Sequence, residues 1–373
     1  MWFFRSPEIV FGEDSLSYLS TLEINRALIV TDKFLKDSEP VKLVLSNLPQ
    51  GVKWQVLAEV SAEPTHREMT ASLDKVSSFE PDWFIAVGGG SSIDTAKVLF
   101  ALYERPDISV YDITPLVKLN LRRKSRLVAV PTTSGTGSEC SWAAMISEEG
   151  EKRKHELASE EIIPDVAILD PRMVLGLPLE QTRNTATDAV VHAVEAYTST
   201  WRNPFSDAFS EKALELIVPN LPLVLRDPAN IAKRESVLIG ASMAGLAFSN
   251  SQIGLAHALG HALGALFKIP HGKCVGLFLP YVVHYNYPAV SERYERLNRI
   301  FEGKESFSET LEHYLHSIGQ PLTLRELGIS QKEYEENLER LVTLASEDTG
   351  VTMNARDART DEIRAIIQQS SGW

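Results

Sequence analysis

Cysteine is almost absent from this chain of 373 residues, which contains only Cys140 and Cys274. Two cysteines cannot build the disulfide framework of a small secreted protein, and they suit a reducing compartment. No run of about eighteen apolar residues occurs, so the sequence offers no membrane-spanning helix. The apolar stretch before Arg5 is too short for the apolar segment of a signal peptide. We therefore expect a cytoplasmic protein that does not enter a membrane.

Basic residues are outnumbered by acidic ones. The chain has 37 Lys and Arg residues against 50 Asp and Glu residues, a formal net charge of −13. This balance argues against nucleic acid or an anionic membrane surface as a main partner. Hydrophobic residues at 44% and charged residues at 23% are typical of a globular protein. The length suffices for two domains with large cores.

The first half of the chain alternates strand-like runs with helical patterns. Two helices are predicted over 37–48 and 67–79, and another follows the glycines after residue 87. Such alternation predicts a mainly parallel sheet that is covered on both faces. The strand-like runs, rich in β-branched and aromatic residues, are 27–31, 54–60, 83–87, 127–130 and 166–170.

After about residue 181, apolar residues recur at helical spacing and no convincing strand remains. We therefore expect an α/β domain over 1–180 and an all-helical domain over 181–373, joined by a short packed connection at 171–183. A cleft between the two domains is the expected ligand site. The predicted helices begin with 182–201, 205–218, 231–249 and 253–267, and continue through the C-terminal tail.

Three consecutive glycines follow one of the strand-like runs. Gly88, Gly89 and Gly90 come directly after 83–87 and precede Ser91 and a helical pattern. At such a turn, backbone N–H groups and the helix dipole favour a phosphate, and glycine lets the backbone approach a pyrophosphate closely. The turn is neither GxGxxG nor a Walker A loop, and a purely structural turn is the alternative.

Two further strand ends carry polar residues. The run at 127–130 leads into a loop of hydroxyls and glycines that includes Thr132 and Thr133. Two such loops favour a dinucleotide as the ligand. Asp32 follows the run at 27–31, where a carboxylate could bind ribose hydroxyls and repel a 2′-phosphate. Helix N-capping by Asp32 is an equal alternative.

Histidine is concentrated in one apolar stretch, which holds His257, His261 and His271. His257 and His261 are four residues apart and share one helix face. A single histidine there would be an ordinary core residue, but three indicate a metal site, because buried imidazoles are unfavourable unless used and imidazole is a common metal ligand. Asp188 and His192 are also four apart, where an ion pair is the commoner explanation.

One Asp and two or three His, from two helices and a loop, form a nitrogen and oxygen donor set with an open position. Such a set suits Fe(II) or Zn(II) and does not suit Mg or Ca. The spacing does not decide whether His257 or His261 is a ligand. A zinc protease is excluded because the Glu of HExxH is missing. Cys274 is a soft-ligand alternative, although a buried free thiol is the favoured interpretation.

Several motifs occur in a fixed order: FIAVGGGSSIDTAK, VPTTSGTGSE, TDAVVHAVEAY, and GLAHALGHALG followed by IPHGKCVGLFLPYVVHYN. Together they resemble the iron-containing (group III) alcohol dehydrogenase family over nearly the whole chain. The resemblance implies an N-terminal dinucleotide-binding domain, a C-terminal helical domain and a catalytic divalent metal in the cleft between them. It also implies a metal-dependent, NAD(P)-linked alcohol dehydrogenase or aldehyde reductase.

The resemblance gives roles to individual residues. His261 matches the non-ligand histidine beside the substrate, which would pass a proton toward solvent, and Phe248 matches an aromatic residue near the substrate. The implied metal ligands are Asp188, His192, His257 and His271. The implied cofactor-binding residues are Asp32, Gly88, Gly89, Gly90, Ser91, Asp94, Thr132, Thr133 and Lys154. The expected metal is Fe(II), with Zn(II) as the alternative; NAD is favoured over NADP, and a homodimer is expected.

The chain departs from the family pattern at Thr187, where glycine is usual, and at Cys140 and Ser141, where Val-Thr is usual. These departures leave the alcohol or aldehyde substrate open. The alternative functions are polyol oxidation resembling glycerol dehydrogenase, a lyase resembling dehydroquinate synthase, and a non-catalytic nucleotide-binding module. The lyase would need a basic pocket for substrate phosphate, to which the helix around 182–198 offers only Arg183. Maleylacetate reductases lack the metal carboxylate that Asp188 supplies.

Overall fold

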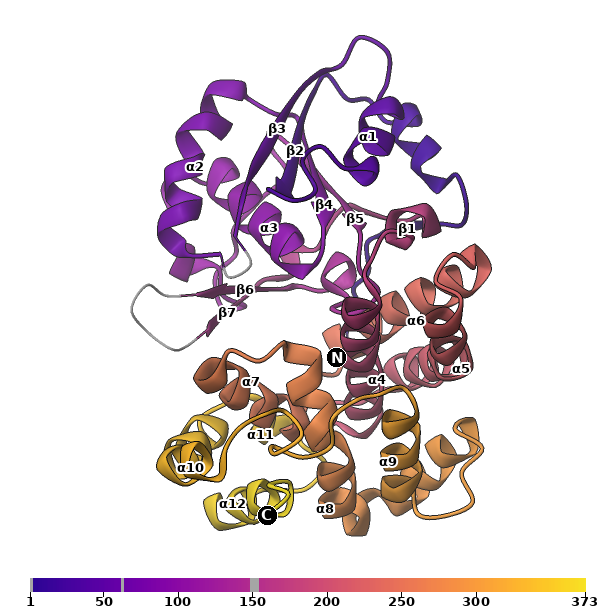
Figure 1. Cartoon of the computed structure of the whole chain (residues 1–373). Coiled ribbons are helices and arrows are strands. Elements are labelled where there is room, and N and C mark those ends of the chain that lie inside the picture. Colours follow the sequence, from indigo (N-terminus) through magenta and orange to yellow (C-terminus); the bar gives the residue numbers. More distant parts are fainter. Residues whose placement is uncertain (1–2, 62–63, 148–153) are drawn as a thin grey trace. The chain divides into compact units, whose positions relative to one another are not determined.

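The computed structural model describes residues 3–61, 64–147 and 154–373 (Figure 1). The chain divides into two compact units, Met1–Leu177 and Pro178–Trp373. The first unit holds all the described strands, and the described elements of the second unit are all helices. Among the described helices, none has both the length and the apolar composition that a membrane crossing needs. An α/β unit followed by an all-helical unit is the fold class that the sequence predicts.

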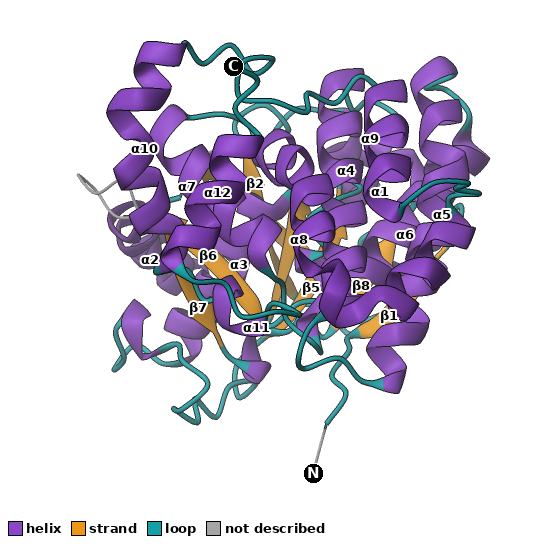
Figure 2. Ribbon diagram, turned by 90° about the horizontal axis from the view of Figure 1, so that it is seen from below, coloured by secondary structure: helices purple, strands orange, loops and turns teal. Residues whose placement is uncertain are grey.

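The first unit is built on a six-stranded sheet with the strand order β1-β8-β5-β4-β2-β3. Every pairing in this sheet is parallel, as the strand–helix alternation predicts. Figure 2 shows β5, β8 and β1 as neighbours in orange. The strands are β1 (Glu8–Phe11), β2 (Arg26–Asp32), β3 (Lys53–Val60), β4 (Trp83–Gly88), β5 (Arg126–Pro131) and β8 (Val166–Leu169).

Three strands are not predicted from the sequence. β1 has four residues and pairs with β8 at the edge of the sheet, with Glu8 opposite Val166. β6 (Ala143–Ser147) and β7 (Lys154–Ala158) form a separate antiparallel pair. Strands this short carry little periodicity, and they are stable only through the partner that the tertiary structure supplies.

Helices cover both faces of the sheet because successive residues of a strand point to opposite sides. On one face, Phe84 packs in a core with α2 (His66–Phe79) and α3 (Gly90–Glu104). On the other face, Ile85 packs in a core with α1 (Glu39–Ser46). Since both faces are buried, a ligand of this unit must bind at the strand ends.

The second unit contains helices of very different length. The four helices predicted from 182 onward and those predicted in the tail are all present, which agrees with the sequence-based prediction of an all-helical unit. The helices are α4 (Leu179–Thr198), α5 (Pro204–Arg226), α6 (Ile231–Ser249), α7 (Leu255–Phe267), α8 (His271–Ile300), α9 (Phe307–Ser317), α10 (Gln331–Ser346), α11 (Gly350–Met353) and α12 (Thr360–Gln369).

Two helices, α5 and α8, extend beyond the stretches that the sequence predicts. The helix expected over 205–218 continues through Pro219 and Pro222 as part of α5. α8 is kinked, since Val290 has the non-helical torsion angles φ −141° and ψ 34°. Each proline removes one backbone hydrogen bond, but a helix whose apolar face is held by its neighbours tolerates such losses.

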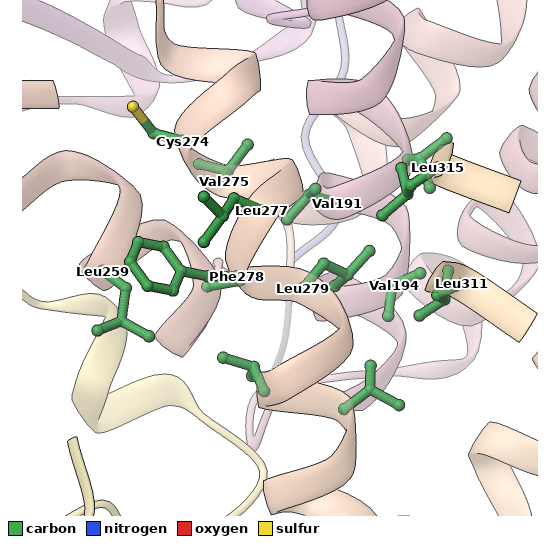
Figure 3. Packing of buried hydrophobic residues seen from close by; sticks show 14 of the residues in the cluster. Val191, Val194, Leu259, Cys274, Val275, Leu277, Phe278, Leu279, Leu311 and Leu315 are labelled. Atoms are coloured by element: carbon green, nitrogen blue, oxygen red, sulfur yellow. The ribbon is translucent and has the colours of Figure 1, made fainter. Parts of the chain in front are cut away.

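α4 runs through the core of the second unit, and its residues from Ala186 to Thr198 are buried. Figure 3 shows Val191 and Val194 of α4 facing apolar side chains of α8 and α9, among them Leu277 and Leu311. Because α4 is packed on several sides, polar side chains on it are held inside the unit at fixed positions.

Candidate metal centre and dinucleotide loop

The four expected metal ligands come from three helices, and the prediction of two helices and a loop is wrong, because His271 begins a helix. Asp188 and His192 lie one turn apart on α4, His257 lies in the first turn of α7, and His271 is the first residue of α8. Oδ1 of Asp188 lies 3.8 Å from Nε2 of His192 and 3.5 Å from Nε2 of His257. The same oxygen lies 3.3 Å from Nε2 of His271. One carboxylate oxygen therefore faces the Nε2 atoms of three imidazoles.

The donor atoms of this cluster suit a cation. Ligand atoms of Asp188, His192 and His257 lie within 4.8 Å of one another. In the described part of the chain, Oδ1 of Asp188 and Nε2 of His257 are buried without a hydrogen-bond partner. Such atoms are rare in folded proteins, and a metal ion would satisfy both. Nitrogen and oxygen donors of this kind fit Fe(II) or Zn(II).

The four side chains differ in exposure. The side chain of His271 is 38% exposed, whereas those of Asp188, His192 and His257 are at most 7% exposed. Of the four, His271 is therefore the most accessible to solvent.

The charges in the cluster are coupled. Burial acts to raise the pKa of Asp188, but the neighbouring histidines bring it well below its usual range. Burial lowers the pKa of His192 to about 3, and it also lowers the pKa of His271. Burial acts in the same direction on His257, but Glu195 and Asp188 outweigh it and raise that pKa to about 9. An ionised carboxylate beside two neutral imidazoles is the state that metal binding needs.

Glu195 is a part of the cluster for which the sequence analysis gave no role. Its Oε2 lies 2.5 Å from Nδ1 of His257 and accepts the N–H of Gly254 at 2.9 Å. Its Oε1 accepts the N–H of Ala256 at 2.6 Å. The carboxylate thus fixes both the ring of His257 and the start of α7. A signal was present, since Glu195 lies seven residues after Asp188 on the same face of α4.

His261 lies beside the cluster and has a carboxylate partner of its own. Nδ1 of His261 is 2.9 Å from Oδ2 of Asp348, whose Oδ1 accepts the N–H of Gly350 at 2.8 Å. The rings of His261 and His271 are stacked, with centroids 5.2 Å apart. Asp348 lies 87 residues from His261, and no spacing rule could have linked them.

Phe248 of α6 lies against the same cluster. Its ring is stacked on that of His192, with centroids 4.3 Å apart and an interplanar angle of 22°. The rings of His192 and His257 are stacked in turn, with centroids 4.5 Å apart. The structure therefore brings Phe248 next to an expected ligand, and its contact with a substrate stays a prediction.

Close packing of α8 on α4 positions His271. A Cβ added to Gly272 would lie 1.9 Å from the carbonyl oxygen of Asn184, so only glycine lets the two backbones meet there. Further along, a Cβ on Gly276 would lie 2.5 Å from Cγ2 of Thr187. The threonine that replaces the usual glycine of the family is thus accommodated by a glycine on the opposite helix.

The glycine turn of the first unit lies between β4 and α3. Gly88 ends β4 with φ +155°, Gly89 is the N-cap of α3, and Gly90 begins the helix. A Cβ on Gly88 would lie 2.4 Å from Oγ of Ser92, and one on Gly90 would lie 3.0 Å from Cγ2 of Thr136. The turn is therefore structurally required, and it also places a helix N-terminus at a strand end, where phosphate binds favourably.

Three expected cofactor residues lie at neighbouring strand ends, because β2, β4 and β5 are adjacent. Asp32 ends β2, Gly88 ends β4, and Thr132 follows β5 with its N–H donating to the carbonyl oxygen of Gly88 at 2.9 Å. Oδ1 of Asp32 accepts the N–H groups of Phe34 and Leu35 at 2.7 and 2.9 Å. Asp32 thus holds the turn that follows β2, and the helix N-capping alternative is wrong, because the N-cap of α1 is Ser38.

The remaining cofactor predictions fall on the loops around these ends. Ser91 lies in the first turn of α3, where its carbonyl oxygen accepts the hydroxyl of Thr95 at 2.8 Å. Thr133 lies against Gly89, since a Cβ there would be 3.2 Å from its Cγ2. Lys154 begins β7, and its side chain lies outside the described part of the structure.

Asp94 uses its carboxylate inside the first unit. One oxygen accepts the hydroxyl of Ser138, and the other accepts the N–H of Met145 at 3.0 Å. These bonds tie α3 to the loop after β5 and to β6. Asp94 thus holds the loop after β5 in place through these hydrogen bonds. Direct contact of Asp94 with a cofactor stays a prediction.

Both cysteines are buried, and they form no disulfide in the described part of the chain. Sγ of Cys274 lies 3.6 Å from the carbonyl oxygen of Ile269, in agreement with the buried-thiol interpretation. Burial raises the pKa of the Cys140 thiol, which disfavours the thiolate needed for metal binding or nucleophilic attack.

Two family models match the chain. The model described as iron-containing alcohol dehydrogenase matches residues 6–171, and the C-terminal model of the same family matches residues 182–371. The chain belongs to the iron-containing alcohol dehydrogenase family. The resemblance inferred from the motifs is thereby confirmed.

Individual iron-containing alcohol dehydrogenases and related proteins are similar over the whole chain. The chain is 32% identical to the NADPH-dependent butanol dehydrogenase of Clostridium saccharobutylicum, over 99% of this chain and 97% of that protein. The solved structure of a 1,3-propanediol oxidoreductase superposes with a TM-score of 0.92 at 29% identity, covering 99% of this chain and 100% of that one. The aldehyde-alcohol dehydrogenase of Streptococcus pneumoniae serotype 4 is 30% identical over 99% of this chain, which spans only 46% of that longer protein.

Proposed function

We propose that this member of the family is a metal-dependent, NAD(P)-linked alcohol dehydrogenase and aldehyde reductase. The observation that carries the proposal is a pair of buried atoms that lack hydrogen-bond partners among the described residues, Oδ1 of Asp188 and Nε2 of His257, which lie beside two further imidazoles. The proposed ligands are Asp188, His192, His257 and His271. When bound, the ion lowers the pKa of an alcohol hydroxyl or polarises an aldehyde carbonyl, and the dinucleotide carries the hydride.

The surrounding side chains position and deprotonate the substrate. Phe248, stacked on His192, forms an apolar wall beside the cluster. His261 lies next to His271 with Nδ1 on Asp348, so its Nε2 is the nitrogen left to exchange a proton with the substrate hydroxyl. An imidazole suits this role near neutral pH. Glu195 keeps Nε2 of His257 directed at the ion.

The glycine turn and the loop after β5 are proposed to hold the pyrophosphate and nicotinamide parts of the dinucleotide. We favour NAD, because the carboxylate of Asp32 at the end of β2 would repel a 2′-phosphate. The butanol dehydrogenase of Clostridium saccharobutylicum, which is named for NADPH, makes this preference worth a direct test. Asp32→Gly should lower the NAD over NADP ratio of kcat/KM, and an unchanged ratio would leave Asp32 only its role in the turn after β2.

Metal removal tests the proposal as a whole. Protein stripped with a chelator and checked by elemental analysis should not reduce aldehydes with NADH, and separate additions of Fe(II) and Zn(II) should restore turnover. His271→Ala should lose both bound metal and turnover, while Lys304→Gln, on an exposed side chain elsewhere in the unit, should keep both. Full turnover by verified metal-free protein would overturn the proposal.

The substrate and the assembly belong to the same proposal. A panel of primary alcohols, secondary alcohols and polyols separates a simple alcohol dehydrogenase from glycerol-type polyol oxidation. Binding of NAD with no alcohol-dependent formation of NADH would leave a nucleotide-binding module. The proposed cytoplasmic homodimer is tested by cell fractionation and by the mass measured in solution.

A further inference from the structure

Two charged side chains are buried on α3, the helix that begins at the glycine turn of the first unit. Lys97 is fully buried, and Asp94, one turn before it, is 8% exposed. Burial of an ammonium group is unfavourable unless its N–H groups are hydrogen-bonded. The hydrogen-bond partners of Lys97 therefore indicate what this side chain does.

Lys97 donates its hydrogen bonds to one short segment of the chain. Its Nζ lies 2.8 Å from the carbonyl oxygen of Ser141 and 3.1 Å from Oγ of the same residue. The third acceptor is the carbonyl oxygen of Ala143, at 2.8 Å. An ammonium group has three N–H donors, and these three acceptors match them. Lys97 thus holds the connection between the 3-10 helix Ser138–Cys140 and β6.

Asp94 holds the same stretch of chain on both sides of this connection. Its carboxylate accepts the hydroxyl of Ser138 and, at 3.0 Å, the N–H of Met145. Asp94 and Lys97 are three residues apart and lie on one face of α3. Together they form a clamp, the α3 clamp, that fastens residues 138–145 to the helix.

The charge of Lys97 suits this arrangement. Burial lowers the pKa of Lys97 to about 8, while Asp94, Glu139 and Cys140 act to raise it. Lys97 is therefore mainly protonated at pH 7, so that all three of its N–H groups are present for the three acceptors.

The loop at 132–137 lies between the α3 clamp and the glycine turn. Its first residue, Thr132, donates its N–H to the last residue of β4. Its middle packs on the glycine turn, since a Cβ on Gly90 would lie 3.0 Å from Cγ2 of Thr136. Its end runs into Ser138, which the clamp holds. The position of the loop relative to the N-terminus of α3, where a phosphate binds favourably, is therefore set at both ends.

We propose that Lys97, together with Asp94, positions this loop for the dinucleotide. The inference rests on the proposed function, which assigns the glycine turn and this loop to the pyrophosphate and nicotinamide parts. Because Lys97 is fully buried, it acts through the loop and is a positioning residue. Groups that bind a ligand must be held within about 0.5 Å of their working positions by the residues behind them. The affinity for NAD should therefore depend on a lysine that lies behind the binding surface.

Calorimetric titration of the metal-loaded protein with NAD, and with NADP in parallel, tests the inference. Lys97→Met removes the N–H donors but keeps a long side chain, and it should weaken dinucleotide binding about tenfold or more. KM for the dinucleotide should rise by the same factor, whereas kcat at saturating dinucleotide should change by less than about twofold. Metal content should equal that of wild type, since the four proposed metal ligands belong to the second unit.

A smaller substitution and a destabilised control separate positioning from folding. Ser138→Ala removes one hydrogen bond of the α3 clamp with little change in volume, and it should weaken dinucleotide binding about threefold. Val44→Ala creates a cavity in the core on the other face of the sheet. It should lower the thermal stability and leave the affinity for the dinucleotide unchanged.

Weaker binding in Lys97→Met and Ser138→Ala, but not in Val44→Ala, supports the inference. Wild-type affinity in both clamp variants would overturn it and leave the proposed function intact. An equal loss of affinity in Val44→Ala and Lys97→Met would also overturn it, because reduced stability alone would then account for the loss. If the wild-type protein bound neither NAD nor NADP, the proposed function would fail, and this inference with it.

Discussion

Nδ1 of His257 lies 2.5 Å from Oε2 of Glu195, while Nε2 of the same ring lies 3.5 Å from Oδ1 of Asp188. The two ring nitrogens are thus divided between a positioning carboxylate and the ligand cluster. When Nδ1 carries the proton donated to Glu195, the lone pair of Nε2 is directed at the cluster. Such outer carboxylates orient metal-binding histidines and increase their basicity.

Glu195→Gln should weaken metal binding about 10- to 100-fold, since it removes the charge that holds His257 and leaves an amide among N–H donors. Competition with a chelator, followed by elemental analysis, measures the change. Glu305→Gln is the matched control, because Glu305 contacts Nδ1 of His313 at the protein surface, where the His313 side chain is 75% exposed. Equal metal affinities of the two variants would contradict the role given to Glu195.

Asp348→Asn should reduce kcat by about 10- to 100-fold while metal content is retained, because His261 loses the carboxylate that fixes its ring. KM should change less than kcat, since Asp348 does not line the ligand cluster. Asp361→Asn, on an exposed side chain paired with Arg359, serves as the control. Wild-type kcat in Asp348→Asn would remove His261 and Asp348 from the proposed proton path.

Gly272→Ala should abolish metal binding, because its Cβ would overlap the carbonyl oxygen of Asn184 and displace the first turn of α8 with His271. Gly264→Ala is the matched control in α7, where the nearest atom to an added Cβ is 3.5 Å away. That substitution should stabilise the helix by up to about 1 kcal/mol. Metal content and thermal unfolding of both variants give the comparison. Normal metal content in Gly272→Ala would show that α8 can move without loss of the cluster.

Lys97 should contribute to the free energy of unfolding an amount that rises with pH between about 8 and 10.5. Burial lowers the pKa of this fully buried lysine from 10.5 to about 8, against the opposing effects of Asp94 and Glu139. In that window the unfolded chain binds a proton that the folded chain does not. The free energy of unfolding therefore increases with pH, by about 3 kcal/mol in all. Below pH 8 this contribution is constant.

Denaturant unfolding of wild type and Lys97→Met across this pH range measures the effect, since the tyrosine titrations are common to both. Nζ of Lys97 donates to the carbonyl oxygens of Ser141 and Ala143, both at 2.8 Å, so the variant should also be less stable overall. The test is the slope of the free energy of unfolding against pH. Parallel pH profiles for the two proteins would show that the Lys97 pKa is not lowered.

Local sequence patterns were sufficient to predict the main helices and strands. The β-branched runs that became β2 to β5 and β8 are long and buried on both faces, so their composition is distinctive. The i, i+4 pairs Asp188–His192 and His257–His261 placed four candidate side chains on two helix faces. β1 was missed because four residues carry too little pattern to be recognised without β8 beside them.

The sequence by itself determined most of the helices and five of the six strands of the parallel sheet. It also determined that the glycines follow a strand and that a carboxylate and several imidazoles lie on helix faces, because backbone preference and apolar periodicity are local properties. Only the tertiary structure decided that Nε2 of His257, and not that of His261, faces Asp188, and that Glu195 and Asp348 hold these two rings. These relationships join residues 62 and 87 positions apart. They depend on how α4, α7 and α8 pack and on where glycine lets backbones meet, which no local pattern encodes.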